Sequence, residues 1–448
     1  MNVHTNARTS DDGATPSGAA ACETFLQENP QVQYVDCIFV DLCGVVRGKR
    51  IARAELERVF ASGLKIPYTI YFLDARGDMV DGLDRTVLGA GLEGPARPVP
   101  GTLTRVNWSQ QPHGQVLMTL CSAKGEPYFG EPRNVLARVV ERFADLGLAP
   151  AVGTTVEFYV VDRERAKNGA PQPIAIDAAA IRDEILPAIV EAAETQGLPP
   201  VAWTPAAPGQ FRMDVKQALD AVRAGDHAVL LRQIVRAVAR KHGFDATFMA
   251  KPYLDRAGSA MHVRAAVLKG AGENAFDDGG IDGDAILRCA VGGVQAVMAE
   301  SIALFAPNAN AYRRFAGRGA AARNKRWGYA NATTAIGVAG EGEARFIEHR
   351  VAGADANPYL VQAAVLTGIH HGIVERLDPG APFEGEATAF VDQTMPFAID
   401  AALVALENGS VLREYFAPAY VDLYCATKRA ELDRFRNHIP AHEYDWYM

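Results

Sequence analysis

The stretch "IEHRVAGADANPYLVQAAVL" (residues 347–366) decides the fold, because it joins a strand with a charged face to a long apolar helix. The strand is predicted over residues 344–351. Alternate side chains of a strand share a face, so Glu348 and Arg350 point the same way as Phe346. Two charged side chains therefore lie on one face of the strand, opposite Ile347 and His349.

The second half of the same stretch contains a helix start. Asn357 is a favoured N-cap residue. Pro358 suits the first helical position, because its fixed φ fits a helix and it has no N–H to leave unpaired. The sequence therefore predicts a helix over residues 358–377.

The whole chain has the composition of a globular protein, with 448 residues of which 49% are hydrophobic and 22% charged. This length predicts two or three domains. A formal net charge of −8 argues against a general nucleic-acid binder, because no basic excess is available to neutralise phosphates. The six cysteines lack Cys-x-x-Cys spacing, which disfavours a zinc site or a disulfide framework and indicates reduced cytoplasmic thiols.

Neither a secretory signal nor a membrane span is expected. The first residues are polar and lack an apolar core. The longest apolar region, residues 285–307, is interrupted by charged and polar residues, so it is predicted to be a buried helix.

Three segments are expected along the chain. Residues 1–24 are rich in small and polar residues and are predicted to be a disordered tail. Residues 25–126 are β-like, whereas residues 127–448 alternate strands with helices. The elements predicted in this last segment include a helix that stops near Gly147, strands over 154–161, 209–215 and 260–268, and a helix over 216–241.

Three of the predicted strands each offer an ionisable side chain from an apolar segment, namely Glu157, His262 and Glu348. Buried charges persist only when they are paired or bound to a metal. Two carboxylates with one imidazole suit a divalent cation, so a convergent Glu157–His262–Glu348 cluster is one interpretation. The alternative is that each side chain is satisfied separately or lies on a solvated sheet face.

The chain resembles the glutamine synthetase superfamily over about residues 25–445, and most closely its γ-glutamyl-polyamine or γ-glutamyl-amide ligase branch. The resemblance rests on the stretch quoted above and on the blocks "VQYVDCIFVDLCGVVRGKRI" (32–51), "APGQF" (207–211), "GSAMHV" (258–263), "NAYRRF" (310–315) and "WGYANATTAIGV" (327–338). It implies an α+β fold with a β-grasp N-terminal domain over residues 25–126. It also implies a larger catalytic-type domain over residues 127–448, with a curved antiparallel sheet and flanking helices.

The resemblance further implies an activity and an assembly. The family makes a γ-glutamyl phosphate from glutamate and ATP, and an amine then displaces the phosphate. Two or three Mg²⁺ or Mn²⁺ ions, held by carboxylates, neutralise the triphosphate in such chemistry. Ring-stacked dodecamers with active sites between neighbouring subunits are typical of the family.

The chain departs from the family pattern at several separate blocks. The positions of metal-binding carboxylates hold Thr155, Pro205 and Arg212, and Arg264 stands in place of a nucleotide-side histidine. Other replaced positions are an asparagine for glutamate (Ala257), a loop base (Ala320), and two arginines that face phosphate (Ala332 and Gly337).

The retained positions give the candidate site. By the resemblance, Glu157, His262 and Glu348 are the remaining metal ligands, and Arg314 and Arg350 are the retained catalytic arginines. Arg212 is a remodelled catalytic position, and Arg264 lies on the cofactor side. Arg212 and Arg264 together would bind a carboxylate or phosphate without metal. The alternative is that Asp214 neutralises Arg212 in a structural pair.

We therefore expect a protein of this fold whose ATP-dependent γ-glutamyl ligase chemistry is lost or remodelled. Such a protein would bind a small amino-acid-like or carboxylate ligand, or serve as a scaffold. The alternatives are an active γ-glutamyl-amine ligase with a non-standard cation site, or a metal-dependent enzyme of another class. We expect at most one Mg or Mn ion per chain, weak ATP binding, and a cytoplasmic homo-oligomer that binds neither nucleic acid nor membrane.

Overall fold

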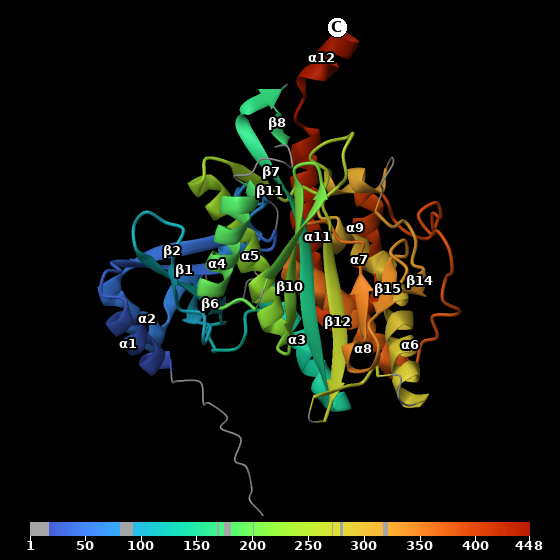
Figure 1. Cartoon of the computed structure of the whole chain (residues 1–448), viewed down its shortest axis with the longest axis horizontal. Helices are drawn as coiled ribbons and strands as arrows, with labels where there is room; N and C mark the ends of the chain where they lie inside the picture. Colours follow the sequence, from blue (N-terminus) through green and yellow to red (C-terminus); the bar gives the residue numbers. More distant parts are fainter. Residues whose placement is uncertain are drawn as a thin grey trace, which may run out of the picture.

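The computed structural model describes residues 18–80, 93–167, 170–173, 181–199, 201–270, 272–277, 281–316 and 321–448. Helices and strands are mixed along the chain, and the strands form two sheets (Figure 1). The expected α+β class is confirmed.

The first sheet belongs to the N-terminal part of the chain. Its strand order is β2-β1-β6-β4-β3, with β5 paired to β6. The elements here are α1 (Gly18–Glu28), β1 (Tyr34–Val40), β2 (Val46–Ala52), α2 (Leu56–Ser62), β3 (Leu64–Pro67), β4 (Glu93–Pro98), β5 (Thr104–Val106) and β6 (His113–Leu120).

Helix α1 corrects the expected extent of the disordered tail. Residues 18–24 are helical, because Cys22 and Phe25 of α1 are buried in the core and hold the helix in place. Residues 1–17, the rest of that expected tail, lie outside the described residues.

The second sheet has the order β14-β15-β16-β12-β7-β10-β9 and carries the candidate site. Its pairs along this path are antiparallel except β14 with β15. Its strands are β7 (Leu148–Lys167), β8 (Ala170–Pro173), β9 (Val201–Ala207), β10 (Gln210–Ala218), β11 (Asp245–Thr247), β12 (Met261–Lys269), β13 (Glu273–Asn274), β14 (Trp327–Tyr329), β15 (Ile336–Ala339) and β16 (Phe346–His349).

Helices cover both sides of this sheet (Figure 1). They are α3 (Pro132–Glu141), α4 (Leu186–Thr195), α5 (Ala221–Lys241), α6 (Ile281–Ala296), α7 (Met298–Phe305), α8 (Pro358–Glu375), α9 (Ile399–Asn408), α10 (Ser410–Phe416), α11 (Pro418–Arg436) and α12 (Ala441–Tyr447). Helix α5 packs on β7 and β10, whereas α8 contacts β12 and α6.

Asn357 confirms the predicted start of α8 and also joins the two parts of the chain. Its side-chain oxygen accepts a hydrogen bond from the Tyr359 N–H at 3.1 Å, and Pro358 occupies the first turn. Its Nδ2 donates to the carbonyl oxygens of Asp41 and Leu42, at 3.1 and 3.2 Å, in the turn between β1 and β2. One side chain therefore caps the buried helix and holds the N-terminal hairpin.

Two helix predictions need correction. The helix expected over 216–241 begins at Ala221, because β10 continues to Ala218 and Asp220 then caps α5. The Asp220 side chain accepts hydrogen bonds from the N–H groups of Val222 and Arg223. The apolar region 285–307 forms two helices, α6 and α7, that meet at 65°. Over the described ranges, this bent pair meets the length and composition of a membrane span only when taken together, and no single helix does so.

Candidate functional site

A cavity of about 210 Å³ lies beside the middle of β7, the start of β12 and the end of β16. It is lined by Glu157, Gly258, Ala260, His262, Arg314, Ala321, Ala322, Ala332, Thr333, Thr334, Arg350 and Thr388. Four of the seven candidate residues therefore border one space. The pairing of β12 with β7 puts His262 and Glu157 on one side of the sheet, since neighbouring strands place residues of matching alternation on the same side. Arg350 directly follows β16, and Arg314 reaches the cavity from the short helix Ala311–Phe315.

Glu348 lies between two of the lining residues. Its Oε1 is 3.6 Å from His262 Nδ1, and its Oε2 is 2.7 Å from Arg350 Nε and 2.6 Å from Arg350 Nη2. Burial alone would raise the pKa of Glu348, but the hydrogen bonds and charges of His262 and Arg350 outweigh it and lower this pKa to about 2. Glu348 is therefore a carboxylate at neutral pH, and one of its oxygens is occupied by a guanidinium.

Glu157 does not complete a three-ligand metal site with this pair. Its Oε2 accepts a hydrogen bond from the backbone N–H of Ala260 at 2.8 Å. Across the residues that the structure describes, no three His, Cys, Asp or Glu side chains lie close enough together to hold a metal ion. The expected Glu157–His262–Glu348 cluster is thus corrected to a His262–Glu348–Arg350 group with a separate glutamate beside it, because Arg350 occupies one oxygen of Glu348 and the Ala260 N–H occupies one oxygen of Glu157.

The site does not fit the family's set of two or three cations. Within the described structure, buried His262 Nδ1 has no hydrogen-bond partner within 3.5 Å, and the nearest carboxylate oxygen in an ion pair with it is Glu348 Oε1 at 3.6 Å. Glu157 and His262, which line the same cavity, are the residues that would hold a single divalent cation, and such an ion would supply positive charge beside an anionic substrate.

Arg212 and Arg264 share an internal carboxylate. Asp214 Oδ1 lies 3.5 Å from Arg212 Nη2 and 3.6 Å from Arg264 Nη2, and it also accepts a hydrogen bond from the Thr155 hydroxyl. The two arginines were expected to bind a ligand anion directly, with Asp214 as the alternative partner. In the structure Asp214 is that partner, because it lies on the same face of β10 as Arg212 and also reaches Arg264 of β12.

Arg314 is buried, with 5% of its surface exposed, and lines the cavity. Its Nη1 donates to the carbonyl oxygen of Val351 at 3.0 Å. Burial lowers the pKa of the Arg314 guanidinium, while the charges of Asp355 and Glu157 act in the opposite direction. Arg314 therefore brings a poorly solvated cation to the cavity, which favours an anionic ligand.

Gly337 makes room for Arg350, a relation that the sequence comparison with the family pattern missed. It lies opposite Glu348 in the register of β15 and β16. A Cβ atom at this position would be 2.5 Å from Arg350 Nη2. The missing side chain at 337 therefore lets the Arg350 guanidinium reach Glu348. The candidate loop-base position, Ala320, lies outside the described residues.

Comparison with known proteins accounts for this architecture. The family model described as "Glutamine synthetase, catalytic domain" matches residues 129–447. The chain belongs to the glutamine synthetase family. It is 35% identical over 447 residues to gamma-glutamylputrescine synthetase PuuA of Escherichia coli, covering 95% of this chain and 93% of that protein. It is also 29% identical to a glutamate–isopropylamine ligase of a Pseudomonas species, over 91% of this chain and 93% of that protein.

A third relative and a solved structure agree with this assignment. Gamma-glutamylethanolamide synthetase GlnA4 of Streptomyces coelicolor is 29% identical, over 89% of this chain and 88% of its own. The structure titled "Apo GmaS without ligand" superposes with a TM-score of 0.81 at 24% identity, covering 94% of this chain and 98% of that one, which supports the fold alone. The glutamine synthetase fold and the γ-glutamyl-amine ligase branch are confirmed. The names of these relatives favour the active-ligase alternative over lost or remodelled chemistry.

Proposed function

We propose that this chain is an ATP-dependent carbon–nitrogen ligase that joins the γ-carboxyl group of a glutamate-like substrate to an amine, with a non-standard cation site. The observation that carries the proposal is the series of relatives named as γ-glutamyl ligases, each aligned along nine-tenths or so of this chain. Arg314 and Arg350 support it, because both reach the cavity between β7, β12 and β16.

The residues of the cavity suit the binding of an anionic substrate. The poorly solvated guanidinium of Arg314 favours a carboxylate over water. Arg350 is held by Glu348 and by the carbonyl oxygen of Asn331, which accepts a hydrogen bond from its Nη1 at 2.5 Å. A guanidinium fixed in this way is preorganised to stabilise negative charge that develops during transfer.

A second candidate function is binding of a carboxylate ligand without transfer. This candidate is supported by charged side chains that pair with each other near the positions that the resemblance assigns to cation binding. Arg212 and Arg264 hold Asp214, and Arg350 holds Glu348. Guanidinium groups that replace divalent cations keep positive charge in the site, but they provide no ion to coordinate a triphosphate.

Assembly and location are part of the proposal. Helix α12 extends away from the body of the chain (Figure 1), and Trp446, Tyr447 and Met448 are 73, 80 and 99% exposed. Such an apolar segment suits contact with a second copy of the chain, in keeping with a ring-stacked homo-oligomer. The six free cysteines suit the reducing conditions of the cytoplasm.

Phosphate release measured with ATP, glutamate and an amine tests the activity. Putrescine, isopropylamine and ethanolamine form the amine panel, because the relatives' names indicate them. The ligase requires release that depends on all three reactants and falls about 10²- to 10³-fold in Arg314→Met. The matched control is Arg313→Met, which alters the exposed neighbour of Arg314 on the same short helix.

Glutamate binding in equilibrium dialysis with no phosphate release for any amine would reject the ligase and support the second candidate. An equal loss of release in Arg313→Met and Arg314→Met would reject the placement of the reaction in this cavity, because the effect would then not come from the cavity.

A further inference from the structure

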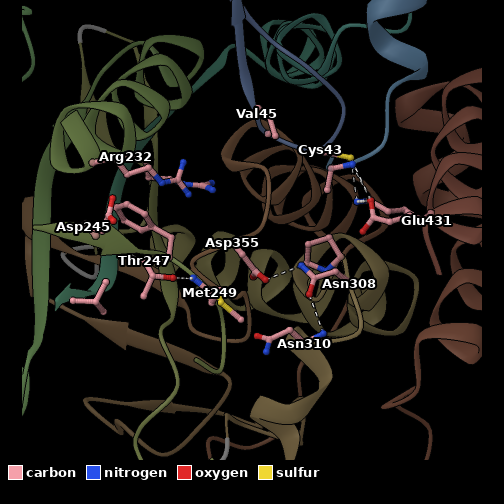
Figure 2. A pocket seen from close by; sticks show the side chains of 18 of the residues that line it. Cys43, Val45, Arg232, Asp245, Thr247, Met249, Asn308, Asn310, Asp355 and Glu431 are labelled. Atoms are coloured by element: carbon pink, nitrogen blue, oxygen red, sulfur yellow. Dashed lines mark hydrogen bonds and ion pairs between the residues drawn. The ribbon is translucent and has the colours of Figure 1, made fainter. Parts of the chain in front are cut away.

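A second cavity, of about 490 Å³, shares no lining residue with the first. Figure 2 shows this second cavity from close by. Its walls come from the turn between β1 and β2, helix α5, strand β11, the residues around Asn308, and helix α11. Its volume is in the range of small-molecule sites in proteins.

Most charged groups of this cavity neutralise each other. Arg240 Nε lies 3.1 Å from Asp245 Oδ1, and Lys428 Nζ lies 3.1 Å from Glu431 Oε2. Two arginines of the wall, Arg232 and Arg236, make no ion pair with a carboxylate within the described part of the chain. Both guanidinium groups lie by the Phe248 ring, at 5.5 and 5.0 Å from its centroid.

Arg232 is buried where a charge is costly. Only 6% of its surface is exposed, and its Nη1 donates to the carbonyl oxygen of Ala356 at 2.7 Å. Burial and the nearby charge of Arg236 lower the pKa of Arg232 to about 9. A guanidinium has five N–H donors, so Arg232 keeps donors for an anion in the cavity. Figure 2 shows its side chain reaching into the cavity from α5.

Asp355 supplies the opposite charge. Its Oδ2 accepts a hydrogen bond from Asn308 Nδ2 at 2.8 Å, and in the described structure its Oδ1 has no hydrogen-bond partner. Burial raises the pKa of Asp355, while the charges of Arg314 and Arg232 act against this rise. A carboxylate accepts about four hydrogen bonds. Asp355 can therefore accept further donors, and it lies near the middle of the group shown in Figure 2.

We propose that this cavity binds an α-amino acid that carries a second carboxylate. Its two carboxylates would pair with Arg232 and Arg236, and its ammonium group with Asp355. The charges agree, because two guanidinium groups and one carboxylate leave one positive charge, and an acidic amino acid has one negative charge. The inference goes beyond the ligase proposal and does not depend on it, since it concerns binding at a separate cavity.

Calorimetric titration with L-glutamate, without nucleotide, tests the arginines. Arg236→Gln is expected to weaken binding at this site about tenfold or more, since it removes a charge-assisted contact. The matched control is Arg223→Gln, which removes a partly buried arginine of the same helix that does not line the cavity. If Arg236→Gln binds like the wild type while Arg350→Met abolishes all binding, glutamate binds only in the first cavity and the proposal is wrong.

Titration with glutarate, which has the two carboxylates but no ammonium group, tests Asp355. The wild type is expected to prefer L-glutamate by about tenfold or more, and Asp355→Asn is expected to lose this preference. Thermal melting of Asp355→Asn establishes that it folds, and Arg236→Gln keeps the test decisive if it does not. Equal affinity of the wild type for L-glutamate, glutarate and inorganic phosphate would overturn the proposal, because the cavity would then be a plain anion site.

Discussion

The fit between Gly337 and Arg350 gives a sharp prediction about a single methyl group. Gly337→Ala would place a Cβ atom 2.5 Å from Nη2 and 2.8 Å from Cζ of Arg350, closer than such atoms approach in folded proteins. The guanidinium must then move off Glu348, although the pair is only 14% and 12% exposed. Losing part of a charge-assisted hydrogen bond costs about 1.5–3 kcal/mol. Alanine recovers about 0.5–1 kcal/mol of that, because glycine weakens a strand. The expected net loss is about 1–2 kcal/mol.

Equilibrium unfolding in urea at pH 7, followed by tryptophan fluorescence, measures this loss. Trp327 is a suitable probe, because it is buried in β14 beside the strand that holds Gly337. In an Arg350→Met background the clash is absent, so the same Gly337→Ala change is expected to be neutral or to stabilise by about 0.5 kcal/mol. An equal cost in both backgrounds, or no cost in the wild type, would refute the reasoning.

Three further predictions concern charge, metal and assembly. The pKa of Glu348 is lowered to about 2 in the folded protein, so the carboxylate contributes up to about 3 kcal/mol to the free energy of unfolding. This contribution is present above pH ~4.5 and is lost as the pH falls through 2. The unfolding free energies of Glu348→Gln and the wild type should therefore differ at pH 7 and converge near pH 2. Elemental analysis of dialysed protein should give no more than about one equivalent of Mg or Mn per chain, and two or more would contradict the ion-pair geometry at Glu348. Trp446→Glu combined with Tyr447→Glu should reduce the particle size in light scattering, and an unchanged size would exclude α12 from the interface.

The sequence predicted the structure best where a preference of a few adjacent residues is not overridden by tertiary contacts. Asn357 and Pro358 begin α8 as predicted, because N-cap and N1 preferences depend on a few adjacent residues. The alternation of the strands correctly placed Glu157 and His262 on one cavity. The start of α5 was predicted too early, since the pairing of β10 with β7 extends to Ala218 and overrides the local helical pattern.

The chemistry of the site was harder to predict, because it depends on which neighbouring side chain pairs with each charged group in three dimensions. Sequence spacing put Arg212 and Asp214 on one face, but it did not decide between a ligand and an internal pair. Gly337 was interpreted only as a lost arginine, since its role depends on the path of the Arg350 side chain. The second cavity combines α5 with Asp355 and α11, which no local motif connects.

The hydrogen bonds of Asn357 also imply a delay during synthesis of the chain, because they join residues that are made at different times. Asp41 and Asn357 are separated by 316 positions, so a ribosome that adds about 5–20 residues per second needs on the order of 15 to 60 s to bridge them. For that interval the carbonyl groups of Asp41 and Leu42, in the turn between β1 and β2, have no Asn357 to bond and must be hydrated. The turn between β1 and β2 is therefore made early but gains these two hydrogen bonds only after Asn357 is made, which leaves it accessible to chaperones during that interval.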